Sequence, residues 1–143
     1  MPISSTTKSG PWVGKVPLLT VILHKSAGQS CLPQSHSNVW KSLTADMRSN
    51  QDRSGIILTP RLQKILQCAA ALEDAATGLV VLTEDPAMLR KLLDERTPLE
   101  HEMLAEVQGP VSPDQLYDMC PTGLKTSISS ASPEKTGLRM AFK

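Results

Sequence analysis

Aromatic side chains and long apolar runs are both scarce in this sequence. Aromatic residues make up 3% of the 143 residues, and the whole set is Trp12, Trp40, Tyr117 and Phe142. Because large rings supply much of the buried area in an ordinary core, we expect a core built mainly from aliphatic side chains. No apolar stretch approaches the roughly 18 residues of a transmembrane helix. The sequence therefore predicts a protein that does not span a membrane.

Cysteine is also scarce, and its spacing excludes two common uses. Cys31, Cys68 and Cys120 are far apart in the sequence, and no Cys-x-x-Cys pair occurs. An odd number of cysteines without paired spacing argues against a disulfide scaffold and against a cysteine-based zinc site. The Asn-x-Ser/Thr pattern of N-glycosylation is absent as well. We therefore expect a reducing compartment, either the cytoplasm or the nucleus.

Acidic residues are absent before Asp46, although the net charge of the whole chain is only +1. Counting Lys and Arg against Asp and Glu gives +4 for residues 1–58, −4 for residues 59–109 and +1 for residues 110–143. With an acidic centre and no overall basic field, a nucleic-acid partner is not expected. The acid-free start, rich in Ser and Thr, supports an alternative hypothesis, a mitochondrial protein whose N-terminal targeting segment is removed on import.

Four pairs of a capping residue and a proline predict helix starts, because such a pair is typical of a first helical turn. The pairs are Thr59-Pro60, Asp85-Pro86, Thr97-Pro98 and Ser112-Pro113. The predicted helices run from Pro60 to Gly78, from Pro86 to Arg96 and from Pro98 to Gly109. A fourth, short helical segment runs from Pro113 to Pro121. In the first of them apolar residues recur three and four apart, so one stripe should be buried.

Two short apolar runs, at residues 55–58 and 79–82, bracket the first predicted helix. A strand, a helix and a strand in this order form a βαβ unit, to which residues 18–24 could add a third strand. We therefore predict a small, α-rich, mixed α/β fold with a single βαβ unit plus two helices. A loose three-helix bundle is the alternative.

Composition predicts three regions along the chain. Residues 1–54 form a basic, largely disordered arm, residues 55–109 form the small α-rich core, and residues 110–143 form a disordered tail rich in Ser and Pro. The tail has few large apolar residues, so burial cannot offset the entropy of ordering it. A core of this size should be marginally stable or depend on a partner.

Motifs for catalysis, metal binding and phosphate binding are all incomplete. His101-Glu102 begins like a zincin helix motif, but Ala105 stands where the second histidine should be. The segment Gly10–Val16 lacks the glycine spacing and the Ser or Thr of a phosphate-binding loop. The sequence therefore predicts no enzyme activity, no metal and no cofactor.

Residues 89–93 read Leu-Arg-Lys-Leu-Leu, within the helix predicted to start at Pro86. This segment resembles the LxxLL box of nuclear-receptor coactivators, in which leucines on one helical face dock into a hydrophobic groove. The resemblance implies a regulatory adaptor that binds a protein partner through Met88, Leu89, Leu92 and Leu93. The alternative is that these leucines belong to the core of the small domain.

Ser132 is the candidate for phosphorylation. Ser132-Pro133-Glu134-Lys135 resembles the target site of cyclin-dependent kinases. A phosphate would add about −1.5 to −2 charges to a weakly basic segment and could switch a charged contact. We therefore expect a phosphoprotein that is regulated through its C-terminal region.

Overall fold

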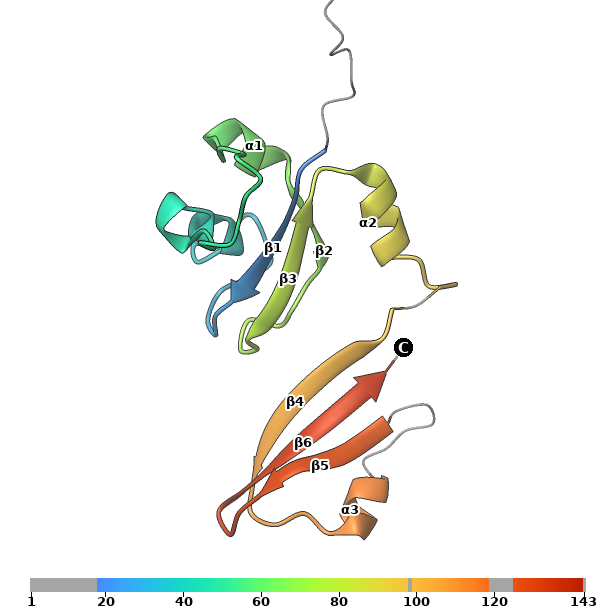
Figure 1. The fold of residues 1–143 in the computed structure, drawn as a ribbon. Helices are drawn as coiled ribbons and strands as arrows, with labels where there is room; N and C mark the ends of the chain where they lie inside the picture. The colour runs from blue at the N-terminus through green and yellow to red at the C-terminus, as the bar shows by residue number, and fades with distance from the viewer. Residues whose placement is uncertain (1–17, 98, 119–124, 143) are drawn as a thin grey trace, which may run out of the picture. The chain divides into compact units, whose positions relative to one another are not determined.

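The computed structural model describes residues 18–97, 99–118 and 125–142, and the chain divides into two compact units (Figure 1). The first unit runs to Arg90 and the second begins at Lys91, whereas composition suggested divisions after residues 54 and 109. Each unit contains one three-stranded sheet in which all neighbouring strands are antiparallel.

The sheet of the first unit is made of β1 (Thr20–Lys25), β2 (Gln67–Ala70) and β3 (Gly78–Thr83), in the order β1-β3-β2. Strand β3 is therefore the central strand and is paired along both edges. Val80 and Leu82 of β3 are completely buried. Successive side chains of a strand point to opposite faces of the sheet. Val80 and Leu82, which are two positions apart, therefore mark the covered face.

The segments that connect the strands supply the other half of this core, and they include three short helical turns. They are η1 (Val39–Ser42), η2 (Ala45–Met47) and α1 (Pro60–Ile65), and Figure 1 shows α1 and the neighbouring turns on one side of the sheet. The buried residues that join the two layers are Leu19, Cys31, Val39, Leu43, Leu66, Val80 and Leu82. As the sequence predicts, the core is aliphatic, and Trp40 only packs against its margin.

Lys25, the last residue of β1, is completely buried. Its ammonium group donates to the backbone oxygens of Ala76 at 2.6 Å, Asp74 at 3.0 Å and Ser26 at 3.3 Å. An ammonium group has three protons, so these three acceptors match its donor capacity. The side chain therefore fastens the end of β1 to the segment that leads into β3.

The second unit contains β4 (His101–Gln108), α3 (Pro113–Asp118), β5 (Lys125–Ala131) and β6 (Lys135–Phe142), with the strands in the order β4-β6-β5. One face of this sheet is apolar, and it includes the almost fully buried Leu138 opposite Ala105. The other face carries the ion pairs Arg139–Glu102 at 2.8 Å and Lys135–Glu106 at 2.5 Å. These pairs join β6 to β4 diagonally across the ladder.

The prediction of an α-rich fold around a βαβ unit is wrong, and so is the alternative of a three-helix bundle. Within the described residues there are six strands, and the α-helices have only six or seven residues. The helix expected to run from Pro60 to Gly78 ends after Ile65, because Gln67–Ala70 pairs with the edge of β3 instead. Residues 55–58 form no strand, and Ile56 and Leu58 pack on the core from a loop.

The helix expected between Pro98 and Gly109 is strand β4. Its side chains alternate between the apolar face, which holds Met103, Ala105 and Val107, and the charged face, which holds Glu102 and Glu106. Pairing with β6 gives hydrogen-bond partners to the backbone of β4 and ion-pair partners to the carboxylates of Glu102 and Glu106. These tertiary contacts outweigh the high helix propensity of Glu, Met, Leu and Ala.

The expected disorder of the flanking regions is also corrected. Residues 125–142 form the hairpin of β5 and β6, and residues 20–47 contribute β1, η1 and η2. The tail has few large apolar residues, but it gains order by cross-strand pairing with β4 and within its own hairpin. Residues 1–17, which carry most of the proposed targeting segment, lie outside the described residues.

In the described part of the chain, no helix is both long enough and apolar enough to cross a membrane. The longest of its α-helices, α2 (Pro86–Leu92), has seven residues. A helix of this length spans about 10 Å at 1.5 Å per residue, which is far less than the thickness of a bilayer core.

We expect Lys25→Met to lower the free energy of unfolding by roughly 2–4 kcal/mol, because the oxygens of Asp74 and Ala76 lose a charged donor in a buried place. Urea unfolding would measure the change. The matched control is Lys41→Met, since exposed Lys41 donates to the His36 oxygen and should contribute less than about 0.5 kcal/mol. Equal stability of Lys25→Met and the parent chain would contradict this role of Lys25.

Candidate functional site

Helix α2 carries Met88, Leu89 and Leu92 of the candidate docking site, and its start is fixed as the sequence predicts. The Asp85 carboxylate accepts a hydrogen bond from the Ala87 N–H at 2.8 Å, and the Asp85 carbonyl accepts from the Leu89 N–H at 2.9 Å. The Thr83 hydroxyl oxygen in turn accepts from the Asp85 N–H at 3.0 Å. Asp85 is therefore the N-cap, and Pro86 occupies the first helical position, where no N–H is needed.

The four predicted docking residues differ in exposure. Leu93 is 59% exposed and Met88 is 38% exposed, whereas Leu89 and Leu92 are half-buried. Leu89 and Leu92 are three residues apart and so share one side of the helix. The helix ends at Leu92, so Leu93 lies in the turn that follows. The structure thus leaves two of the four side chains open to a partner and half-covers the other two.

Charged residues surround these leucines. Arg90 and Lys91, between the first and second leucines of the motif, are both exposed. After the helix, the Asp94 carboxylate accepts from the Arg96 backbone N–H at 3.0 Å and pairs with its guanidinium at 3.1 Å. These contacts, the backbone bond first, hold the pKa of Asp94 below its usual value. The charges of Arg90 and Lys91 make the exposed side of α2 basic.

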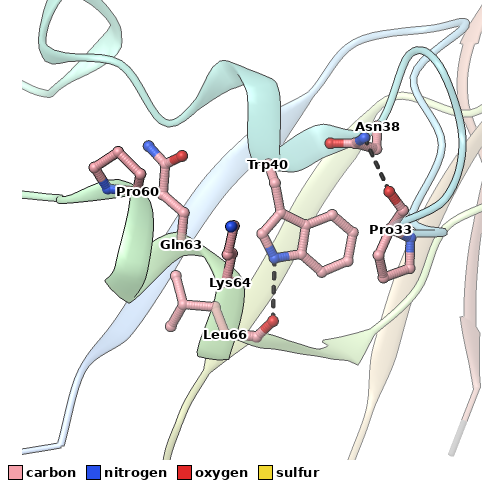
Figure 2. A pocket seen from close by; sticks show the side chains of 7 residues that line it. All are labelled: Pro33, Asn38, Trp40, Pro60, Gln63, Lys64 and Leu66. Carbon is pink, nitrogen blue, oxygen red and sulfur yellow. Dashed lines mark hydrogen bonds between the residues drawn. The ribbon is translucent and has the colours of Figure 1, made fainter.

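A shallow pocket of about 330 Å³ lies beside Trp40, between η1 and α1 (Figure 2). It is lined by Pro33, Asn38, Trp40, Pro60, Gln63, Lys64 and Leu66. The Trp40 indole N–H donates to the Leu66 carbonyl at 3.1 Å, so the ring contributes mainly its apolar surface to the pocket. Sequence reasoning missed this pocket. Its one signal was Trp40 itself, an isolated large ring in a chain with few of them.

Asn38, at the end of this pocket, holds the preceding loop. Its amide nitrogen donates to the carbonyls of Ser35 at 2.8 Å and Pro33 at 3.1 Å. Its amide oxygen is buried and has no hydrogen-bond partner among the described residues. A buried acceptor without a partner costs free energy, and here the two donated bonds fix the amide in that orientation.

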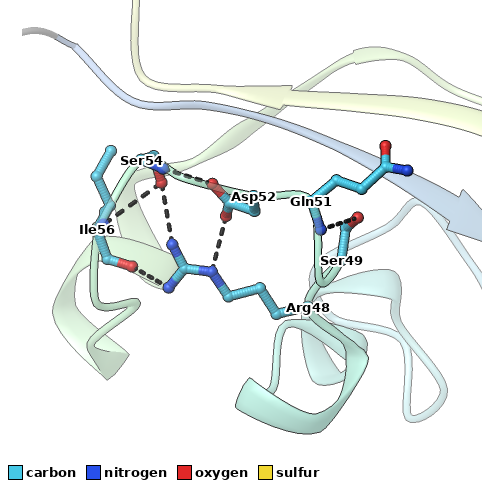
Figure 3. Close-up of polar contacts among 6 residues, drawn as sticks. All are labelled: Arg48, Ser49, Gln51, Asp52, Ser54 and Ile56. Carbon is cyan, nitrogen blue, oxygen red and sulfur yellow. Dashed lines mark hydrogen bonds and ion pairs between the residues drawn. The ribbon is translucent and has the colours of Figure 1, made fainter.

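The loop from Arg48 to Ile56 is closed by a network around one guanidinium group (Figure 3). Arg48 pairs with Asp52 at 2.7 Å and donates to the Ile56 carbonyl at 2.6 Å and to the Ser54 hydroxyl at 3.0 Å. The Ser54 N–H donates to Asp52 at 2.8 Å. This backbone bond, the Ser54 hydroxyl and Arg48 together hold the pKa of Asp52 below its usual value. The network is structural, because each group satisfies another within the same loop.

Ser132 lies in the turn between β5 and β6, not in a disordered tail. Its N–H and its hydroxyl both donate to the Lys135 carbonyl, at 2.8 and 3.0 Å, and its hydroxyl oxygen accepts from the Lys135 N–H at 3.2 Å. The side chain is exposed. A kinase could therefore reach it, but phosphorylation would replace the hydroxyl proton that helps to close the turn. Phosphorylation itself stays a prediction.

The incomplete zincin motif has no helix to support it, since His101 and Ala105 both lie on β4. Positions 101 and 105 of a strand share a face but lie about 13 Å apart, too far for two side chains to hold one metal ion as they do on a helix. Among the residues that the structure describes, no group of three or more His, Cys, Asp and Glu side chains could hold a metal ion.

Comparison with known proteins places the chain in no family. No family model matches it, and no curated protein and no solved structure matches it significantly. The candidate site therefore depends on the geometry of α2 described above.

We expect Asp85→Ala to destabilise α2 by about 1 kcal/mol, because the Ala87 N–H loses its acceptor at the helix start. Faster amide hydrogen exchange at Leu89 would report this fraying. The matched control is Asp85→Asn, whose amide oxygen is an equally good cap and should leave the exchange rate close to that of the parent chain. Equal exchange in all three proteins would show that the cap does not stabilise α2.

The Arg48–Asp52 network predicts that the stability of the loop from Arg48 to Ile56 depends on pH. Because the folded pKa of Asp52 is depressed, its contacts stabilise the loop above the ordinary value of 3.8 and are lost as the pH falls through the lower folded value. The chemical shift of the Ser54 amide, measured by NMR, should therefore change with a midpoint below pH 3.8. In Asp52→Asn this transition should vanish. A midpoint at or above the ordinary value would contradict the network.

Proposed function

We propose that this protein is a non-enzymatic interaction or regulatory adaptor and that α2 docks into a hydrophobic groove on a protein partner. The observation that carries the proposal is the exposure of Met88 on α2 and of Leu93 in the turn directly after it, with the start of the helix fixed by the Asp85 cap. Burying a leucine or methionine side chain in a groove is worth about 1.5–3 kcal/mol. A short, pre-formed helix also loses less conformational entropy on binding than an unstructured peptide.

The partner's groove should have an acidic rim. Arg90 and Lys91 are exposed between the motif leucines, so they would lie at the edge of any groove that covers Leu93. Opposite charges at a rim speed association and fix orientation more than they raise affinity. Binding should therefore become slower at high salt, while the apolar contact persists.

Phosphorylation of Ser132 is part of the same proposal, as a means of regulation. Lys135 is adjacent to the Ser132 hydroxyl in the hairpin turn and pairs with Glu106 at 2.5 Å, an ion pair that raises the pKa of Lys135. A phosphate on Ser132 would compete with Glu106 for this ammonium group. The modification would thus change the charged face of the second sheet. The cytoplasm or the nucleus, where such kinases act, is the proposed location.

The test compares two leucines of similar exposure in the whole 143-residue chain. A photoreactive residue in place of Met88 would identify the partner by cross-linking in cells, and binding to that purified partner would then be measured. Leu93→Ala should weaken binding by roughly tenfold to a hundredfold, the loss expected for one buried leucine. The control Leu104→Ala, at a position 66% exposed on β4 against 59% for Leu93, should change binding less than about twofold.

Circular dichroism and urea unfolding would show that both variants keep the fold of the parent chain. Equal binding by the parent protein, Leu93→Ala and Leu92→Ala would exclude α2 as the docking element. Equal loss in Leu93→Ala and Leu104→Ala would point to a general effect of surface apolar area instead.

A further inference from the structure

Strand β1 is an outer strand of the first sheet, and only one of its two edges is paired. It pairs with β3 in an uninterrupted register, and none of the described strands lies on its other side (Figure 1). Residues 20–24 read Thr-Val-Ile-Leu-His, a stretch without Asp, Glu, Lys, Arg or Pro in which β-branched and apolar residues prevail. An apolar edge strand of this kind is a template on which a further strand can pair.

The register shows which backbone groups of β1 are unpaired. The Glu84 N–H donates to the Leu19 carbonyl at 3.0 Å, so these two residues form a hydrogen-bonded pair directly beside the ladder. Hydrogen-bonded and non-hydrogen-bonded pairs alternate along an antiparallel ladder. The odd-numbered residues of β1 therefore bond to β3, and the N–H and C=O groups of the even-numbered residues point to the outer edge. The residues at that edge are Thr20, Ile22 and His24, and their backbone groups have no partner among the described residues.

The other three sheet edges in the described part of the chain each carry a feature that opposes strand pairing. Strand β2 has only four residues and a register shift between Cys68 and Ala70. Strand β5 also contains a register shift, and β4 carries the carboxylates of Glu102 and Glu106. Short strands, bulges and charged side chains are common means by which proteins keep sheet edges from pairing. None of these features protects residues 20–24 of β1.

The one charged residue of β1 does not protect the edge either. The Lys25 side chain is completely buried, and its ammonium group is engaged with backbone oxygens of its own unit. The outer residues are open to solvent, because Thr20 and His24 are exposed and Ile22 is 64% exposed. A second strand could therefore reach the unpaired groups without meeting a charged side chain.

We propose that β1 pairs with β1 of a second copy of this chain, antiparallel and about a two-fold axis at Ile22. In this register Ile22 lies opposite Ile22 of the partner subunit, and Thr20 lies opposite His24 of the partner subunit. All three outer residues then form hydrogen-bonded pairs, which allows about six hydrogen bonds between the two strands. The two sheets of three strands become one continuous sheet of six. This surface is distinct from α2.

A second copy fits this edge better than a charged partner strand would. The pairing is isologous, so the same residues supply both halves of the contact. It brings no two like charges opposite each other, because residues 20–24 carry no acidic or strongly basic side chain. The outer strands of the joined sheet are then the two copies of β2, each short and with a register shift. The assembly therefore stops at the dimer.

The dimer should be weak and should depend on concentration. A contact made along one strand edge buries less than the roughly 1,200 Å² of a standard interface. We therefore expect a dissociation constant of about 10–100 µM. The protein would be mainly monomeric when dilute and would dimerise where it is locally concentrated.

The test measures self-association of the whole 143-residue chain by sedimentation velocity from about 5 to 500 µM. Ile22→Lys places two lysines opposite each other at the centre of the contact and should weaken the dimer by roughly tenfold or more. The matched control is Leu79→Lys. Leu79 is also 64% exposed, but it lies on β3, which is paired along both edges, so dimerisation should change by less than about twofold. Urea unfolding would show that both variants keep the stability of the parent chain.

Amide hydrogen exchange of the unmodified chain at both ends of this concentration range identifies the edge. The amides of Ile22 and His24 should exchange severalfold more slowly at the high concentration. The Val21 amide, which already bonds to β3, should show no such change. This measurement needs no substitution, so it decides the matter even if Ile22→Lys fails to fold.

Four results would overturn the proposal. A monomer at every concentration would exclude the dimer and leave the edge to a strand of another protein. Equal loss of the dimer in Ile22→Lys and Leu79→Lys would indicate that sheet faces pack together instead. A dimer in which the Ile22 amide exchanges as fast as in the monomer would place the contact elsewhere. Slow exchange of Ile22 and His24 already at the low concentration would mean that a segment of the same chain covers the edge.

Discussion

Pairing along both edges of one central strand is the constraint on which each unit depends. In the first unit β3 is bonded to β1 and β2, and its fully buried Val80 and Leu82 are the surface against which η1 and α1 pack. In the second unit β6 is bonded to β4 and β5, carries the almost fully buried Leu138, and is joined to β4 by cross-strand pairs of charges. With so few aromatic rings, backbone pairing has to supply much of the order that a larger core would give.

Local signals in the sequence predict the structure well where the structure is decided locally. Thr59, Asp85 and Ser112 each precede a helix that begins at the following proline, and the run at residues 79–82 is the centre of β3. These elements need only a cap, a proline or a β-branched run, and all of those are visible in a few residues. The places of Leu89 and Leu92 on α2 could be predicted in the same way, because they follow from the helix start.

Elements decided by a distant partner could not be predicted in this way. Residues 67–70 and 101–108 have a composition typical of helices. They form strands because their backbone groups pair with β3 and β6, respectively. A short stretch of sequence does not show that such a distant partner exists. The same limit applies to the pocket beside Trp40, since its lining comes from segments that only the folded chain brings together.

In both sheets the central strand is the last of its three strands in the sequence, with the order β1-β3-β2 in one and β4-β6-β5 in the other. During synthesis on the ribosome, β1 and β2 therefore leave the exit tunnel with no neighbour to pair with, and the same holds for β4 and β5. Neither sheet can begin to assemble until its final strand has emerged, so nascent chains expose bare strand edges for most of each unit's translation. Chaperones that shield such edges should matter more for this chain than for one in which the first two strands of each sheet pair with each other.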